Sequence, residues 1–186
     1  MSDHRRHSLR TWILSLVLAA VVPTAAAPGA AAQDSDLEQI KYAEDYERLQ
    51  GIAAVKNPVT RAERLVALYK DRPDMDVKLA VYADGLFTEN MDALLKQQNS
   101  AGVRALSERA LAVRPKFGEA YLYLGVALKN EGKFDEAMKA FAKGHLIENR
   151  FQKRAKSQLD ILYRARNKGS LVGQEKLIEA ARQELK

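Results

Sequence analysis

The chain contains no cysteine among its 186 residues. It therefore has no disulfide, no thiolate nucleophile and no cysteine for a lipoprotein anchor. Two glycine motifs that bind phosphates, G-x-x-x-x-G-K-[ST] and G-x-G-x-x-G, are also absent. No serine stands in the nucleophile setting G-x-S-x-G. The sequence thus carries no signature of a nucleotide-binding loop, a cysteine nucleophile or an activated serine.

Histidine is also scarce. His145 is the one histidine after residue 32. A single histidine without cysteine cannot supply the nitrogen and sulfur ligands of a zinc site. Asp74 and Asp76 lack the glycine and closing glutamate of a calcium loop. We therefore expect no metal, no cofactor and no enzyme activity. Catalysis by paired carboxylates is the third-ranked hypothesis.

The N-terminal residues have the composition of a secretory signal. Arg5, Arg6 and Arg10 precede an apolar run at residues 12–22, and small residues fill residues 25–32. Ala30-x-Ala32 is a cleavage site before Gln33, so residues 1–32 are predicted to be a signal peptide. The alternative is an uncleaved N-terminal anchor, although the apolar run is shorter than the roughly 20 residues of a membrane span. We expect an exported, periplasmic protein, or one anchored in the membrane through residues 1–32.

Basic charge is concentrated in the C-terminal part of the chain. Residues 33–114 contain 12 basic and 14 acidic residues, whereas residues 115–186 contain 15 basic and 9 acidic residues. Nucleic acid is not an expected partner, because an exported protein rarely meets it and the basic stretch lacks interleaved aromatic residues. Peripheral contact with anionic lipid is compatible with this charge and stays open. The sequence does not indicate an oligomeric state.

The clearest pattern lies between Pro115 and Asn149. Its apolar residues follow helical spacings of three and four, a glycine interrupts the first helix, and a second glycine separates the helices. A glycine inside a helix is costly, so we expect the next helix to press against Gly125. Gly132 suits a left-handed helix end. The residues that carry the pattern are Tyr121, Leu124, Gly125, Leu128, Gly132, Phe134, Ala137 and Phe141.

This pattern resembles one tetratricopeptide repeat (TPR), a helix–turn–helix unit of about 34 residues. Gly144 and Asn149 depart from it, since the family usually has alanine and proline there. Shifting the pattern back by one repeat reveals a degenerate copy that ends at Pro115. The resemblance implies a protein that binds a protein or peptide partner in a concave groove, lined mostly by the first helix of each pair.

Apolar periodicity predicts eight helices, and no stretch alternates convincingly like a strand. Ser35–Glu38 and Thr60–Glu63 are capping boxes, while Asp74 and Ser170 are candidate caps of later helices. Val77 and Val81 are expected on a buried side. The predicted fold is all-α: a short, TPR-like right-handed solenoid of about four antiparallel hairpins. It covers residues 33–186, with the best repeat at about 118–151.

A basic run after Arg150 provides the candidate site. Several lysines and arginines share one predicted helix with a single acidic residue, Asp160. Lys129, Lys153 and Lys156 are expected to converge on an acidic segment or a carboxyl terminus of a partner. The alternative is a merely solvated face. The candidate partner-binding residues are Tyr123, Lys129, Asn130, Lys153, Lys156 and Arg164.

These features favour an exported scaffold or adaptor of the bacterial cell envelope that binds a protein or peptide, with an acidic one expected. The alternative is a membrane-anchored assembly factor that recruits its partner at the membrane surface. The fate of residues 1–32 separates these two hypotheses.

Overall fold

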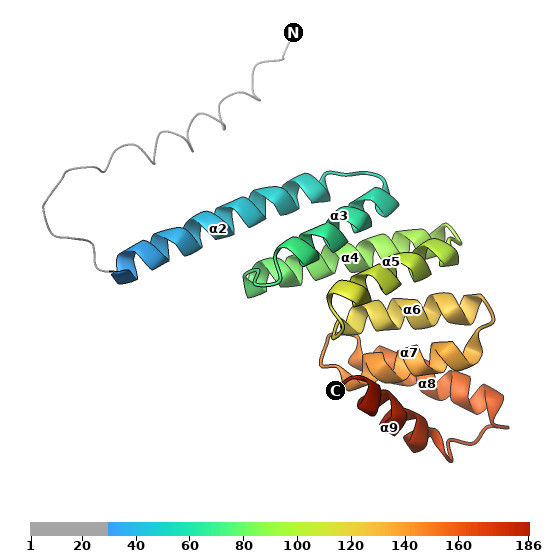
Figure 1. Ribbon diagram of the computed structural model, residues 1–186. Coiled ribbons are helices and arrows are strands. Elements are labelled where there is room, and N and C mark those ends of the chain that lie inside the picture. The colour runs from blue at the N-terminus through green and yellow to red at the C-terminus, as the bar shows by residue number, and fades with distance from the viewer. Residues whose placement is uncertain (1–29) are drawn as a thin grey trace, which may run out of the picture. The chain divides into compact units, whose positions relative to one another are not determined.

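The computed structural model describes residues 30–186, and residues 40–186 form one of two compact units. The described residues form eight helices and no strand, which confirms the predicted all-α class (Figure 1). The predicted segment 1–32 lies almost entirely outside the described residues. The helices are α2 (Ala30–Ala53), α3 (Pro58–Asp71), α4 (Val77–Lys96), α5 (Ser100–Val113), α6 (Gly118–Asn130), α7 (Phe134–Leu146), α8 (Gln152–Arg166) and α9 (Gln174–Glu184).

The first described helix begins earlier than the sequence predicted. We expected it to start at the capping box of Ser35, but α2 already begins at Ala30. Alanine has the highest helix propensity of all residues, so the alanines before Gln33 extend the helix past the box. The predicted cleavage position therefore lies inside a helix.

Three further predicted caps, Thr60, Asp74 and Ser170, are also wrong. Asn57 caps α3, because its side-chain oxygen accepts a hydrogen bond from the Thr60 amide at 3.0 Å. The next residue is a proline in the first turn, where its missing amide costs nothing. Asp76, not Asp74, caps α4 by accepting from the Lys78 amide at 2.8 Å.

The third wrong cap concerns α9. Its N-terminal cap is Gly173, which has a φ of 90°, rather than Ser170. The Ser170 hydroxyl instead accepts a hydrogen bond from the Val172 amide inside the preceding loop, at 3.1 Å. Ser170 therefore stabilises the loop before α9 and does not cap the helix.

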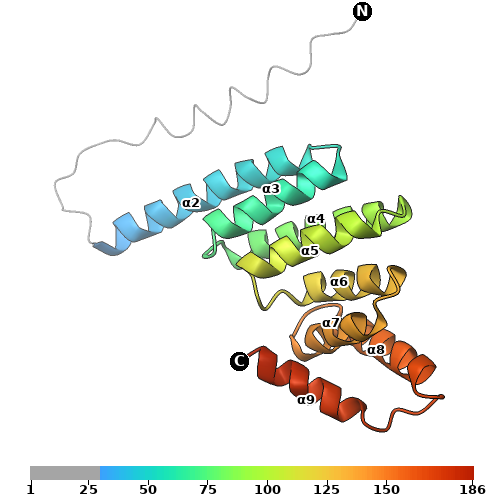
Figure 2. The same cartoon turned by 45° about the vertical axis from the view of Figure 1, so that its right-hand side comes forward.

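Neighbouring helices from α3 to α8 pack against one another in chain order (Figures 1 and 2). Alternate helices also touch: α3 contacts α5, α4 contacts α6, α6 contacts α8, and α7 contacts α9. The ends of α4 and α6, the starts of α5 and α7, and the starts of α6 and α8 are each 34 residues apart. The centre of the unit is therefore periodic in its helix boundaries.

The central pair α6 and α7 is in close contact at Gly125. A methyl group added to Gly125 would lie 2.5 Å from two ring carbons of Phe141, which is fully buried. The expectation that the next helix presses on this glycine is confirmed, with Phe141 as the contact. Gly132 follows α6 with a φ of 77°, and the Lys133 amide donates back to the Leu128 carbonyl at 2.9 Å. This left-handed ending reverses the chain into α7.

Asn149 is hydrogen-bonded at the turn that follows α7. Its amide nitrogen donates to the carbonyls of Gly144 and Ile147, at 3.0 Å and 2.7 Å. Its oxygen accepts from the Phe151 amide at 2.7 Å, just before α8. Asn149 thus satisfies backbone groups on both sides of the turn that connects α7 with α8.

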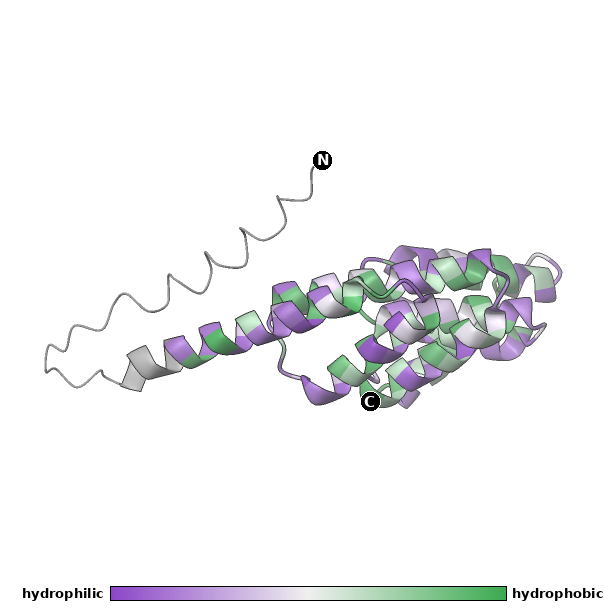
Figure 3. Cartoon of the chain, turned by 90° about the horizontal axis from the view of Figure 1, so that it is seen from above, coloured by the Kyte–Doolittle hydropathy of each residue, from purple (hydrophilic) through white to green (hydrophobic). Residues whose placement is uncertain are grey.

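The amphipathic helices bury two apolar clusters, one centred on α3–α5 and one on α6–α8 (Figure 3). Leu86, Met91 and Leu94 of α4 are buried. Val77 and Val81 are not, because 76% and 64% of their surfaces are exposed. Arg114, which follows α5, bonds to Asp84 of α4, and Arg150, which precedes α8, bonds to Thr88 of α4. Val77 and Val81 lie earlier in α4 than these two bonded residues. They are exposed there, so the prediction that they are buried was wrong.

We predict that Gly125→Ala destabilises the fold by about 1–3 kcal/mol through overpacking against Phe141. Phe141→Leu shortens the blocking side chain, so the double variant should lose less stability than the two single variants together. Urea unfolding of the four chains measures this coupling. Additive losses would show that α6 and α7 do not meet at Gly125.

Gly85→Ala is the matched control, because Gly85 lies inside α4 and nothing stands within 4 Å of an added methyl group. Here the change should raise the unfolding free energy by about 0.5–1 kcal/mol, through helix propensity alone.

Candidate partner-binding surface

The predicted site residues belong to α6 and α8, and α6 also contacts α4. These three helices are alternate helices of the chain, and α6 contacts both of the others. Their mutual contacts decide which of the six predicted residues can face a partner. The structure divides the six into buried, internally bonded and free side chains.

Tyr123 is fully buried, so its ring cannot form part of a partner-binding surface. Its hydroxyl donates to Asp92 of α4 at 2.8 Å, and its ring meets the Phe151 ring edge-on with centres 6.3 Å apart. Burial, followed by the hydrogen bond to Asp92 and the charge of that carboxylate, raises the pKa of Tyr123 well above its usual value. Tyr123 therefore connects α4 and α6 with the start of α8, and its prediction as a binding residue is corrected.

Lys129 and Asn130 connect α6 to its neighbours. The Lys129 ammonium donates to the Gln158 side chain of α8 at 2.9 Å. The Asn130 amide donates to the Ser100 hydroxyl of α5 at 3.1 Å. Both side chains are reachable at the end of α6, but each already holds one internal hydrogen bond.

Lys156 faces α9 rather than α6. Its ammonium lies 2.5 Å from the Asp160 carboxylate and 3.1 Å from the Gln174 side-chain oxygen. Burial opposes ionisation of Asp160, but the hydrogen bond from Lys156 and the positive charge of that lysine prevail and lower the pKa of Asp160. Two residues along a helix correspond to a turn of about 200°. Lys156 and Gln158, the partner of Lys129, are therefore on different sides of α8, and the expected convergence of Lys129 with Lys156 does not occur.

Lys153 and Arg164 are exposed on α8, together with Arg154. Ile161 lies between them and 60% of its surface is exposed. Within residues 36–186, no carboxylate lies within 4.0 Å of these three cationic groups, whereas Lys156 and Arg166 of the same helix are paired. We call Lys153, Arg154, Ile161 and Arg164 the α8 basic face.

Sequence reasoning missed Ile161, although a signal was present. The buried stripe of α8 follows Ala155, Leu159 and Leu162. A helical step of about 100° per residue places Ile161 more than 90° from the centre of that stripe. An aliphatic residue so far from the buried side, among cationic residues, makes this part of α8 a candidate for a contact surface.

A polar cluster was not predicted, and it positions α8. Asp84 of α4 accepts hydrogen bonds from the Arg114 guanidinium at 2.5 Å and 3.3 Å and from the Tyr69 hydroxyl at 2.9 Å. The Arg114 guanidinium carbon also lies 4.5 Å and 4.3 Å from the ring centres of Tyr69 and Phe117. Aromatic faces attract a cation in this arrangement. One carboxylate thus connects α3, α4 and the segment that leads into α6.

Arg150 extends this cluster to the start of α8. Its guanidinium donates to the Thr88 hydroxyl at 2.5 Å and to the Asp84 carbonyl at 3.4 Å. Its Nε lies 3.9 Å from the Glu119 carboxylate of α6. Arg150 thereby joins α4, α6 and α8. No local signal could reveal this, because Arg150 and its partner Thr88 are 62 residues apart.

Glu119 is the buried acid of this cluster. Only 8% of its surface is exposed. Burial raises its pKa above the ordinary carboxyl value, the nearby Asp84 adds to this, and Arg150 and Arg114 oppose it. Glu119 therefore holds a proton more tightly in the folded chain than in the unfolded chain.

The remaining chemistry of the described residues is sparse. No three acidic or histidine side chains among residues 36–186 are arranged to hold a metal ion. His145 is partly buried, its Nδ1 has no hydrogen-bond partner in the described part of the chain, and burial lowers its pKa. None of the helices within residues 30–186 has the length and apolarity needed to span a membrane.

Comparisons of the chain with protein-family models, with curated proteins and with solved structures gave no match.

We predict that Glu119→Gln makes stability less sensitive to pH. Below the unfolded carboxyl pKa of about 4.3, the raised folded-state pKa of Glu119 does not lower the free energy of unfolding. As the pH rises through the folded-state pKa, the buried carboxyl group must ionise, and the wild-type chain loses stability. The difference in unfolding free energy, variant minus wild type, should therefore grow with pH over this window.

Urea unfolding between about pH 4 and pH 8 measures this difference. Glu148→Gln removes one carboxylate from an exposed position and is the matched control. A pH-independent difference for Glu119→Gln would contradict the burial of its charge.

Proposed function

We propose that residues 33–186 form a short, TPR-like right-handed solenoid of about four helical hairpins that serves as a scaffold or adaptor for a protein or peptide partner. Three observations support the repeat. Helix boundaries recur at 34 residues in the centre of the unit, alternate helices touch, and Gly125 admits the Phe141 ring. A repeat unit buries its apolar face only by stacking on its neighbours.

In this proposal, the partner binds at the α8 basic face. The observation that carries it is the group of three cations without a carboxylate partner around the exposed Ile161. An acidic segment of the partner supplies the missing charges, and one of its apolar side chains covers Ile161. Opposite charges speed association and select the partner, while apolar burial contributes affinity.

The binding face is preorganised by the contacts that hold α8. Arg150 binds Thr88 of α4, and Lys129 binds Gln158 of α8. On its other side, α8 is held to α9 through Lys156 and Gln174. A rigid face loses little conformational entropy when a partner binds. The lysines predicted as direct contacts, Lys129 and Lys156, thus contribute by positioning α8.

We predict that the triple variant Lys153→Glu/Arg154→Glu/Arg164→Glu loses the partner. Wild type and variant are used to capture proteins from a cell-envelope extract, and the captured protein is identified. Its acidic segment is then titrated as a synthetic peptide. Affinity should fall at least about tenfold in the variant, and binding to wild type should weaken with rising salt.

The triple variant Lys70→Glu/Lys78→Glu/Lys96→Glu is the matched control. It changes the net charge equally at exposed lysines of α3 and α4. Circular dichroism and urea unfolding must show that both variants remain folded. A partner retained by the α8 variant, or lost equally in both variants, would exclude the α8 basic face as the binding site.

We further propose that the mature protein is exported and begins at Gln33, which places the scaffold in the periplasm. The charged, apolar and small-residue order of residues 1–32 supports this. The second hypothesis is an assembly factor anchored through the same residues.

N-terminal sequencing of the protein from fractionated cells should start at Gln33 and find it in the soluble envelope fraction. An intact N-terminus in the membrane fraction would favour the anchored factor instead.

A further inference from the structure

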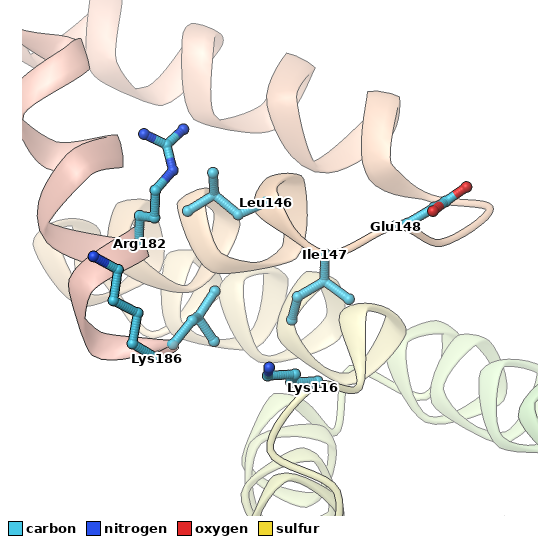
Figure 4. A pocket seen from close by; sticks show the side chains of 7 residues that line it. Lys116, Leu146, Ile147, Glu148, Arg182 and Lys186 are labelled. Atoms are coloured by element: carbon cyan, nitrogen blue, oxygen red, sulfur yellow. The ribbon is translucent and has the colours of Figure 1, made fainter.

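A second candidate site lies away from the α8 basic face and shares no residue with it. A pocket of about 540 Å³ is lined by the segment before α6, the end of α7 and the end of α9. Figure 4 shows the side chains that line it. They are Lys116, Leu146, Ile147, Glu148, Arg182, Leu185 and Lys186.

The lining combines an apolar centre with cationic groups around it. Leu146, Ile147 and Leu185 are only partly covered by the protein, so their side chains offer apolar surface. Lys116 comes from the segment before α6, whereas Arg182 and Lys186 come from the C-terminal end of the described chain. Three positive side chains thus line the pocket from two segments that are distant in sequence.

Negative charge at this pocket is limited to one side chain, Glu148. In Figure 4 its carboxylate points away from the three cationic side chains. Arg182 and Lys186 do have internal partners, the carboxylate of Glu179 and the side-chain oxygen of Gln183, one turn back along the chain. These contacts are exposed, so a bound carboxylate can compete with them at little cost.

The size and chemistry of the pocket define a ligand class. Small-molecule pockets commonly enclose roughly 300–1,000 Å³, with mostly apolar linings and a few charged groups that fix orientation. A ligand here needs an apolar part for Leu146, Ile147 and Leu185 and a negative end for the cations. Lysine ammonium groups bind such an end as point charges, whereas arginine can bind a carboxylate through two parallel hydrogen bonds.

We propose that this pocket binds a carboxylate joined to an apolar chain. The carboxylate lies against Lys116 and Arg182, and the apolar chain covers Leu146, Ile147 and Leu185. A fatty acid and a peptide carboxyl terminus that ends in an apolar residue both have this chemistry. The site is independent of the partner proposed for α8.

Octanoate and N-acetyl-leucine are the probes, because they represent the acyl chain and the peptide terminus. Octan-1-ol and N-acetyl-leucinamide keep the apolar parts but lack the charge. Methyl NMR spectra of the full chain follow Leu146, Ile147 and Leu185 during titration. Saturable shifts are expected for a carboxylate, with binding at least about tenfold tighter than for its neutral counterpart.

The variant Lys116→Glu/Arg182→Glu should weaken carboxylate binding at least about tenfold. The control Lys139→Glu/Lys176→Glu changes two exposed lysines of a neighbouring depression and should bind like wild type. Octanoate binding alone supports an acyl ligand, and N-acetyl-leucine binding alone supports a peptide terminus. Equal binding of the neutral probes, no saturable shift with either carboxylate, or full binding by the Lys116/Arg182 variant would overturn the proposal.

Discussion

The close approach of α6 and α7 at Gly125 is the contact on which the rest of the structure depends. Phe141 occupies the space that any side chain at position 125 would need. This contact brings α6 and α7 together, and α7 in turn packs against both α8 and α9. The position of the basic helix therefore follows from one missing side chain in the centre of the unit. Apolar burial of this kind is strong but has little direction.

Polar side chains supply the direction that apolar packing lacks. Asp84 binds Arg114 and Tyr69, and Arg150 reaches from the start of α8 to Thr88 and Glu119. Charge-assisted hydrogen bonds have restricted geometry, so they set how far α8 can slide along α6. The cost falls on Glu119, whose buried carboxyl has a raised pKa. This cluster of charged groups thus exists only because several helices contribute to it.

The same cluster separates structural cations from those that a partner could use. Arg114, Arg150 and Lys156 are held by groups of the chain itself. Lys153, Arg154 and Arg164 have no carboxylate within 4.0 Å in the described residues, although the Arg154 guanidinium lies 5.7 Å from the centre of the Phe151 ring, and the three surround an exposed isoleucine. Both proposed sites combine apolar surface with positive charge, but they differ in shape. The α8 basic face is open and suits a polypeptide segment, whereas the pocket beside α9 suits a carboxylate joined to an apolar chain.

The sequence by itself determined the all-α class, the left-handed turn at Gly132 and the contact at Gly125. These depend on spacings of three and four and on glycine, which act over a few residues. The sequence could not show which side chains are bonded within the chain and which are available to a partner. Lys129 and Tyr123 were predicted to face a partner together with Lys153 and Arg164, yet Gln158 binds Lys129 and Asp92 binds the Tyr123 hydroxyl. Those partners lie 29 and 31 residues away, so only the tertiary structure, by bringing distant helices together, separated the internally bonded side chains from the available ones.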